Sequence, residues 1–130
     1  MNFPKELKFT KNDEWIRVEG DQGTIGISDY AQQQLSDIVF VETTVAVGES
    51  VAKGVTCATV ESVKAAAEVY LPVAGTVTAV NEELPKSPEQ VNSDPYGAAW
   101  MVKIKIASPS ELGDLLDPSA YEAYCQERTT

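Results

Sequence analysis

The 130-residue chain contains no histidine, the side chain most used for proton transfer near neutral pH. This absence excludes a Ser-His-Asp triad, a Cys-His pair and a histidine-ligated metal site. Its two cysteines, Cys57 and Cys125, lie far apart and form no CxxC motif, although one disulfide is possible by count. No pair of carboxylates stands out as an acid–base pair. We therefore expect neither catalytic residues nor a metal site, and the protein is not predicted to be an enzyme.

Basic residues are also scarce, with 10 Lys and Arg against 20 Asp and Glu, and the formal net charge is -10. The chain has no basic stripe that could replace phosphate counterions, which argues against binding to nucleic acid. The same charge argues against an anionic membrane surface. It favours partners with basic docking patches, and it also keeps a small protein in solution.

Long apolar runs are missing, since none approaches the roughly 18 residues that a membrane helix requires. Residues 1–8 have neither the apolar core of a signal peptide nor the Arg- and Ser-rich composition of a transit peptide. These features predict a cytoplasmic protein. The length fits one domain over residues 1–130, which needs no disulfide or metal to bury a core.

Short alternating runs separated by Gly and Pro predict a mostly β protein, a sandwich or flattened barrel with helical additions. The runs that predict strands are residues 9–18, 24–27, 38–41, 55–60, 69–71, 75–81 and 100–106. We expect the continuous apolar run 38–41 to be a buried strand. Short helices are predicted at residues 30–35, after a cap by Ser28 or Asp29, and after capping-box spacings that begin at Ser87 and Ser108. A C-terminal helix is expected from Pro118 onward.

Lys64 lies in a short break between the runs 55–60 and 69–71, which indicates a β-hairpin with the lysine near its tip. Its neighbours are small alanines and two carboxylates, Glu61 and Glu68, so nothing bulky shields the amine. Such a lysine can be acylated by another enzyme and can carry a group outward. The plain alternative is a solvated surface lysine, one of eight in the chain.

The string Glu61-Ser62-Val63-Lys64-Ala65, with an acidic residue and Pro-Val-Ala-Gly after it, resembles the lipoyl-attachment hairpin of the H proteins of the glycine cleavage system. Other segments resemble the same family in order: residues 8–10, 14–15, 25–32, 37–42, 91–97, Trp100 and the tail 110–121. The resemblance covers nearly the whole chain. It implies a barrel-sandwich hybrid of the lipoyl/biotinyl type, with short helices and a C-terminal helical tail.

The resemblance implies a carrier with lipoate bound covalently to Lys64 by a lipoate ligase or an octanoyl or lipoyl transferase. Residues Glu61, Ser62, Val63 and Ala65 would then be recognised during lipoylation. The lipoyl group would accept an aminomethyl group from pyridoxal-phosphate glycine decarboxylase and deliver it to the tetrahydrofolate-dependent aminomethyltransferase. Dihydrolipoamide dehydrogenase would reoxidise it. A shuttle of this kind is expected to be a monomer.

The resemblance also implies a surface cleft that shelters the aminomethyl cation, lined by Glu14, Glu68 and Asn12. A carboxylate is the expected charge-assisted partner of an ammonium. The chain departs from the family at Asp13, where histidine is common, and this aspartate adds negative charge beside the cleft.

Other functions remain open at this point. A lipoyl domain of a 2-oxoacid dehydrogenase usually carries Asp-Lys-Ala and a linker, and a biotin carrier carries Met-Lys-Met; this chain has neither. An H-like relay would donate lipoyl groups to other enzymes instead of serving glycine cleavage. The remaining alternative is an acidic interaction module with an unmodified lysine.

Overall fold

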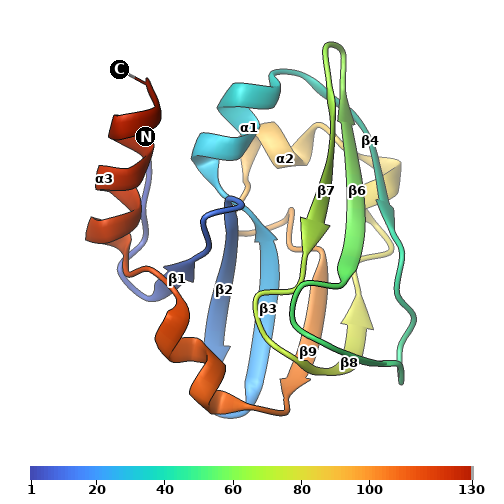
Figure 1. Cartoon of the computed structure of the whole chain (residues 1–130). Coiled ribbons are helices and arrows are strands. Elements are labelled where there is room, and N and C mark those ends of the chain that lie inside the picture. Colours follow the sequence, from blue (N-terminus) through green and yellow to red (C-terminus); the bar gives the residue numbers. More distant parts are fainter. Residues whose placement is uncertain (130) are drawn as a thin grey trace.

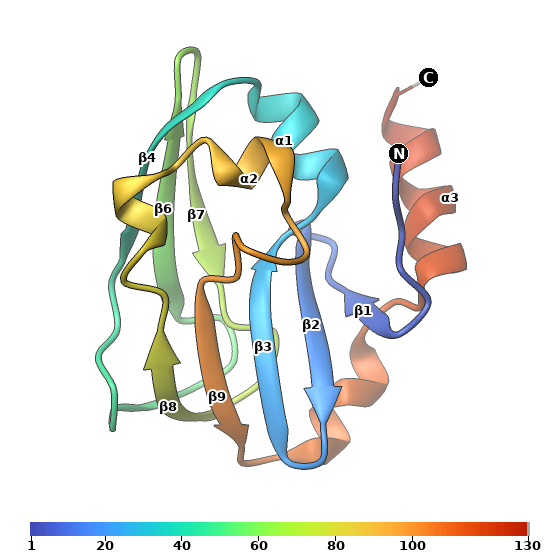
Figure 2. The ribbon, with the colours of Figure 1, turned by 180° about the vertical axis from the view of Figure 1, so that it is seen from behind.

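The computed structural model describes residues 1–129 and consists of two antiparallel sheets with helices around them (Figures 1 and 2). The larger sheet has the strand order β1 (Leu7–Phe9), β2 (Glu14–Glu19), β3 (Gln22–Ile27), β9 (Val102–Ile106), β8 (Gly75–Val80) and β5 (Ser50–Val51). The smaller sheet has the order β4 (Ile38–Thr43), β6 (Thr56–Ser62) and β7 (Ala66–Tyr70). The helices are α1 (Asp29–Leu35), α2 (Gln90–Ser93) and α3 (Pro118–Thr129), with 3-10 turns η1 (Leu84–Lys86) and η2 (Pro109–Asp114).

The main core lies between the two sheets and is built from alternate residues of their strands. Ile25 of β3, Val60 of β6 and Ile104 of β9 are fully buried there. Because successive side chains in a strand point to opposite faces, this alternation leaves Lys103 and Lys105 on the outer face. The predicted β-sandwich is confirmed, and the strand predicted at residues 100–106 forms as β9.

A second, aromatic cluster lies on the outer side of β1 and β2, under α3. Phe9 stacks on Tyr121 with ring centroids 4.4 Å apart, and Tyr96 packs edge-on against Trp15. The Trp15 indole N–H donates to the carbonyl of Pro95 at 3.0 Å. This cluster holds the C-terminal helix and the loop around Tyr96 against the sheet (Figure 2).

The first helix begins as predicted. The Ser28 hydroxyl accepts a hydrogen bond from the Ala31 N–H at 3.1 Å, which satisfies one of the open donors of the first turn. Neither predicted capping box forms, since η2 and α2 have no side-chain cap. Glu111 instead accepts from the Ala74 N–H at 2.8 Å, so its carboxylate joins η2 to the start of β8.

The prediction of one strand over residues 9–18 is wrong. The chain turns between Thr10 and Glu14, because the Thr10 hydroxyl accepts from the N–H groups of Asn12 and Glu14. Asp13 takes a left-handed conformation there, with φ 73°. Aspartate tolerates that region better than most residues, and the polar run 10–14 with Asn12 and Asp13 is the sequence signal for this turn.

The prediction of a fully buried strand at residues 38–41 is also wrong. The pairing of β4 with β6 shifts register between Ile38 and Phe40, which is a β-bulge. Ile38 and Val41 remain buried, whereas Val39 and Phe40 face solvent. No helix among residues 1–129 is long and apolar enough to cross a membrane.

The packing of Trp15 against Gly26 generates the first prediction. A Cβ added at Gly26 would lie 2.8 Å from the ring of Trp15, which is fully buried and cannot move aside. We expect Gly26→Ala to lower the free energy of unfolding by about 1–3 kcal/mol in urea titrations. Gly113→Ala is the matched control, because nothing lies within 4 Å of its Cβ position. Equal losses in both variants would contradict this packing.

Candidate functional site

Lys64 lies at the tip of the β6–β7 hairpin, which extends beyond the rest of the molecule at the top of Figure 1. The tip is held by the Ser62 hydroxyl, which accepts from the Lys64 N–H at 3.3 Å and the Ala65 N–H at 3.0 Å. The Ser62 N–H also donates to the Ala65 carbonyl at 2.7 Å. These bonds fix the backbone conformation of the tip. Ser62 therefore positions the lysine, in addition to its predicted role in recognition during lipoylation.

The lysine side chain itself is exposed, as are Glu61, Val63 and Ala65 on either side. The ion pairs among residues 1–129 do not include Lys64. An exposed amine on a hydrogen-bonded hairpin can reach the active site of another protein, and losing its charge would break no internal ion pair.

Glu14 is the only acidic residue buried in the described part of the chain, and it starts β2 directly after the turn. Its carboxylate accepts from the Thr10 hydroxyl at 2.5 Å and from the Tyr70 N–H at 3.2 Å. Burial raises the pKa of Glu14 from 4.5 to about 7, although these hydrogen bonds oppose the rise. The bond to Tyr70 also joins the base of the hairpin to the larger sheet.

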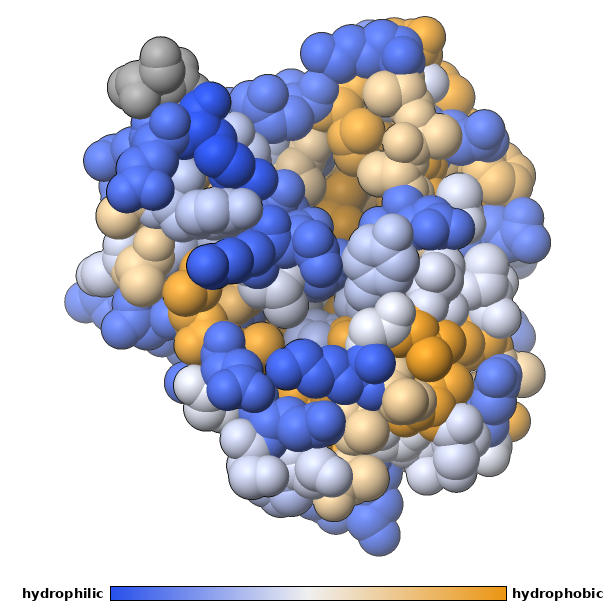
Figure 3. Space-filling model, in the orientation of Figure 1, coloured by the Kyte–Doolittle hydropathy of each residue, from blue (hydrophilic) through white to orange (hydrophobic). Residues whose placement is uncertain are grey.

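Two depressions adjoin the hairpin. The larger, about 420 Å³, has Glu14 in its wall together with Asn12, Lys53, Tyr70 and residues of the 114–116 segment. The smaller, about 160 Å³, lies between α1 and the hairpin and is lined largely by apolar side chains, visible as the recess beside the hairpin in Figure 3. Its lining residues are Asn12, Asp13, Ile27, Ala31, Gln34, Leu35, Val60, Ala67, Glu68 and Val69.

The three residues predicted to line one cleft are therefore divided between two neighbouring depressions. Asn12 lines both, Glu14 lines only the larger and Glu68 only the smaller. Tyr70 links the two carboxylates, since its N–H donates to Glu14 and its hydroxyl donates to Glu68 at 3.1 Å. The hydrogen bond from Tyr70 to Glu68 raises the pKa of the Tyr70 phenol.

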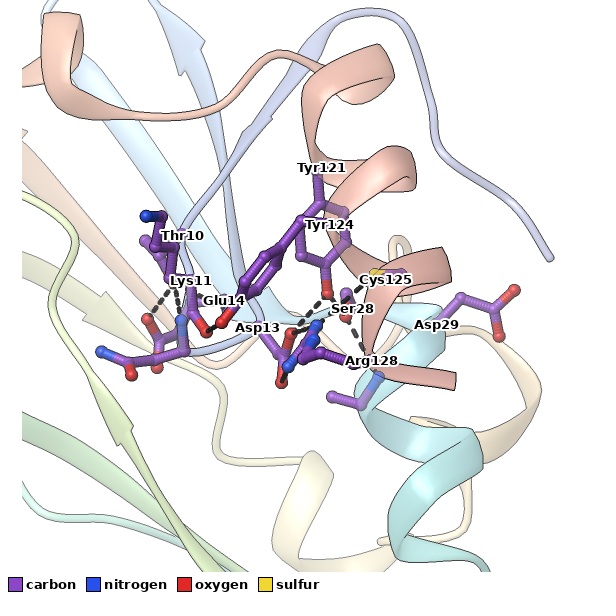
Figure 4. Close-up of polar contacts among 12 residues, drawn as sticks. Thr10, Lys11, Asp13, Glu14, Ser28, Asp29, Tyr121, Tyr124, Cys125 and Arg128 are labelled. Carbon is purple, nitrogen blue, oxygen red and sulfur yellow. Dashed lines mark hydrogen bonds and ion pairs between the residues drawn. The ribbon is translucent and has the colours of Figure 1, made fainter. Parts of the chain in front are cut away.

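Asp13 does not leave an uncompensated charge beside these depressions. Arg128 of α3 donates to both of its carboxylate oxygens, at 2.6 and 3.1 Å, and the Tyr121 hydroxyl donates at 2.8 Å (Figure 4). The Ser28 hydroxyl lies 2.6 Å from that of Tyr121. The sequence indicated that Asp13 adds a negative charge beside the cleft. In the structure Asp13 instead links the β1–β2 turn to the C-terminal helix.

Comparisons with known proteins agree with this arrangement. A model of the glycine cleavage H-protein family matches residues 7–128. A glycine cleavage system H protein from Acidobacterium capsulatum is 49% identical over 129 residues, covering 99% of this chain and 98% of its own. One from Paramagnetospirillum magneticum is 56% identical over 117 residues, covering 90% and 93%. The chain belongs to the glycine cleavage H-protein family.

The fold supports the same family assignment. The crystal structure of a glycine cleavage system H protein from Mycobacterium marinum superposes with a TM-score of 0.83 at 31% identity, covering 98% of this chain and 99% of that one. The family comprises the lipoyl-carrying shuttles of the glycine cleavage system. The predicted lipoyl-type fold with short helices and a C-terminal helix is confirmed.

The apolar lining of the smaller depression was not predicted from the sequence. Ala31 and Leu35 come from α1, Ile27 from the end of β3 and Val60 from β6. The spacing of Ala31 and Leu35 places them on one helix face, which was the available signal. That this face meets the hairpin follows only from the tertiary structure.

The raised pKa of Glu14 predicts a pH-dependent stability. The folded protein holds this proton more tightly than the unfolded chain, so its stabilisation is complete below pH 4.5 and is lost as the pH rises through about 7. In wild type we expect this group to lower the free energy of unfolding by up to about 3 kcal/mol across that interval. Urea titrations from pH 4.5 to 8 should show that Glu14→Gln removes this fall, while Glu82→Gln, at an exposed carboxylate, leaves it. Parallel curves for wild type and Glu14→Gln would contradict the prediction.

Proposed function

We propose that Lys64 carries lipoate in an amide linkage and that the chain, as a single carrier domain over residues 1–130, presents it in turn to the enzymes of the glycine cleavage system. The observation that carries this proposal is an exposed lysine on a hydrogen-bonded hairpin tip in a chain of this family. The chain acts as a carrier: it positions the lipoyl group for other enzymes and contributes no catalytic residue of its own.

The residues present fit the group. The Lys64 amine is accessible, and the adjoining depression has an apolar lining suited to an alkyl arm. In the attachment step the Lys64 nitrogen forms a C–N bond to the carbonyl carbon of an activated acyl donor, a thioester or an acyl phosphate anhydride. The bond from that carbon to the donor's leaving group breaks, and the amine loses a proton. The neutral amide that results costs less to bury than a charged lysine.

When bound, the lipoyl group would supply a redox-active disulfide and so a sulfur able to carry an aminomethyl unit. The chain's own residues shelter that unit from water. Glu68 lies four residues from Lys64, about 13 Å along the strand, beside the apolar depression. An ammonium there would face Glu68 and Asn12, with Glu14 across Tyr70. A cation near Glu14 would also favour the ionised form of its carboxylate.

The partners implied are those of the family's pathway: glycine decarboxylase, the aminomethyltransferase and dihydrolipoamide dehydrogenase, plus a lipoate ligase or an octanoyl or lipoyl transferase. The net charge of -10 supports fast encounters with basic partner surfaces. A tether on Lys64 raises the effective concentration of the group at each partner's site, so individual contacts can stay weak. We expect the carrier to work as a monomer.

Lys64→Arg tests the attachment directly. We expect it to abolish lipoylation by a lipoate ligase and glycine cleavage in the reconstituted system, because a guanidinium forms no amide under these conditions. The melting temperature should stay unchanged, since Lys64 is exposed and in no ion pair of the described residues. Lys86→Arg, at another exposed lysine, should leave lipoylation intact. A variant Lys64→Arg that is still lipoylated would refute the attachment site.

Glu14→Ala tests the shelter. Loss of a charge-assisted partner should shorten the lifetime of the aminomethyl-loaded form about tenfold, followed as ammonia release in the absence of the aminomethyltransferase. Glu82→Ala, at an exposed carboxylate, should have no effect on that lifetime. An unchanged lifetime in a folded Glu14→Ala protein would remove Glu14 from the shelter.

A further inference from the structure

Three bulky apolar side chains lie exposed on the Lys64 hairpin and on β4, the strand paired with it. Val39, Phe40 and Val63 are 55%, 41% and 68% exposed, and they are half of the six large apolar residues found exposed in the described chain. We call this group the tip patch. Figure 3 shows apolar surface at the upper right, over the hairpin and β4. Exposed apolar groups of this kind rimmed by polar residues mark interaction sites.

The bulge in β4 creates the patch. A regular strand would turn one of two successive residues inward, but the register shift after Ile38 leaves both Val39 and Phe40 outside. Ile38 and Val41 on either side are buried, so the core at this strand is filled without Val39 and Phe40. Bulges re-aim side chains in this way next to functional sites.

The patch is joined to the hairpin tip. The Val63 N–H donates to the Asp37 carbonyl at 3.0 Å, which ties the residue beside Lys64 to the start of β4. Phe40 lies directly opposite Glu61 in the β4–β6 register, on the outward face. A surface that binds Val39 and Phe40 therefore holds Lys64 in a defined place.

The rim of the patch is acidic. Asp37, Glu42 and Glu61 are exposed, and the ion pairs within residues 1–129 include none of them. Lys103 and Lys105 belong to β9 of the larger sheet and not to the β4–β6–β7 sheet that carries the patch. Lys86 of η1, which packs against β4, is paired with Glu83. The apolar patch and its acidic rim together favour a partner with an apolar recess bordered by Lys or Arg.

We propose that the tip patch is the docking surface for the enzyme that acylates Lys64, an enzyme whose acceptor site has an apolar recess for Val39 and Phe40 with a basic border. This inference rests on the proposed function. The acylating enzyme forms its bond at the Lys64 nitrogen, so it must hold the hairpin tip against its own active site. Enzymes that act on the finished group reach it at the far end of a long arm and do not need the tip itself.

The test uses the full chain, a purified lipoate ligase from the same host, ATP and free lipoate, with modification at Lys64 followed by intact mass. We expect Val39→Ser combined with Phe40→Ser to lower kcat/KM for lipoylation at least tenfold, mainly through KM. Val47→Ser is the matched control, since Val47 is 62% exposed and lies in the loop between β4 and β5. It should stay within twofold of wild type. Lipoylation is compared well below the melting temperature of each variant, so that both are fully folded during the assay.

The outcomes separate this inference from the proposed function. A wild-type chain that neither the ligase nor an octanoyl or lipoyl transferase of the host modifies at Lys64 would refute the proposed function. If the wild type and the double variant were lipoylated equally well, the docking surface would be refuted while the proposed function would stand. If the double variant were lipoylated normally and, once lipoylated, failed only in exchange with glycine decarboxylase, the patch would serve that enzyme and this proposal would be wrong.

Discussion

The antiparallel pairing of β6 with β7 determines where Lys64 can go, because the lysine lies in the turn that joins these two strands. The tip of the pair stands clear of the larger sheet and is held by the backbone bonds of β6 and β7 and by the Ser62 hydroxyl. On one side β4 continues the sheet along β6 and meets Val63. A carrier needs this combination, since a floppy loop would offer the lysine to many enzymes and a buried one to none.

The other edge of the hairpin is joined to the larger sheet through Glu14. A buried carboxylate is costly unless it has hydrogen-bond partners, and here the partners come from the β1–β2 turn and from the base of β7. The turn is fixed in its own right by Asp13, which Arg128 and Tyr121 tie to the C-terminal helix. The C-terminal helix thus helps place Glu14, the buried carboxylate that Tyr70 links to Glu68 of the proposed shelter. Burial of Cys57 raises its thiol pKa to about 12, so this thiol stays protonated and does not compete for disulfide exchange.

The fold class, the hairpin and the lysine at its tip could be predicted from sequence because each depends on short-range pattern. Alternation marked the strands, and Ser28 marked the start of α1. The bulge at Val39 could not be predicted, since the apolar run 38–41 continues through it while the backbone departs from a regular strand. The turn at Asp13 lies in the polar run 10–14, where Asn12 and Asp13 are typical turn residues, so a signal for it was present in the sequence. The apolar lining of the smaller depression combines α1, β3 and β6, and that meeting is a property of the tertiary structure. Whether Glu14 and Glu68 act together also depends on Tyr70, which no motif singled out.

The central claim is that Lys64 carries the lipoyl group. Intact mass and peptide mapping of the protein purified from its own host test it most directly. We expect one lipoyl increment, located on the peptide that contains Lys64. A protein that is unmodified at Lys64, and that a lipoate ligase also fails to modify in vitro, would contradict the account and leave an acidic β-sandwich that binds partners through its surface alone.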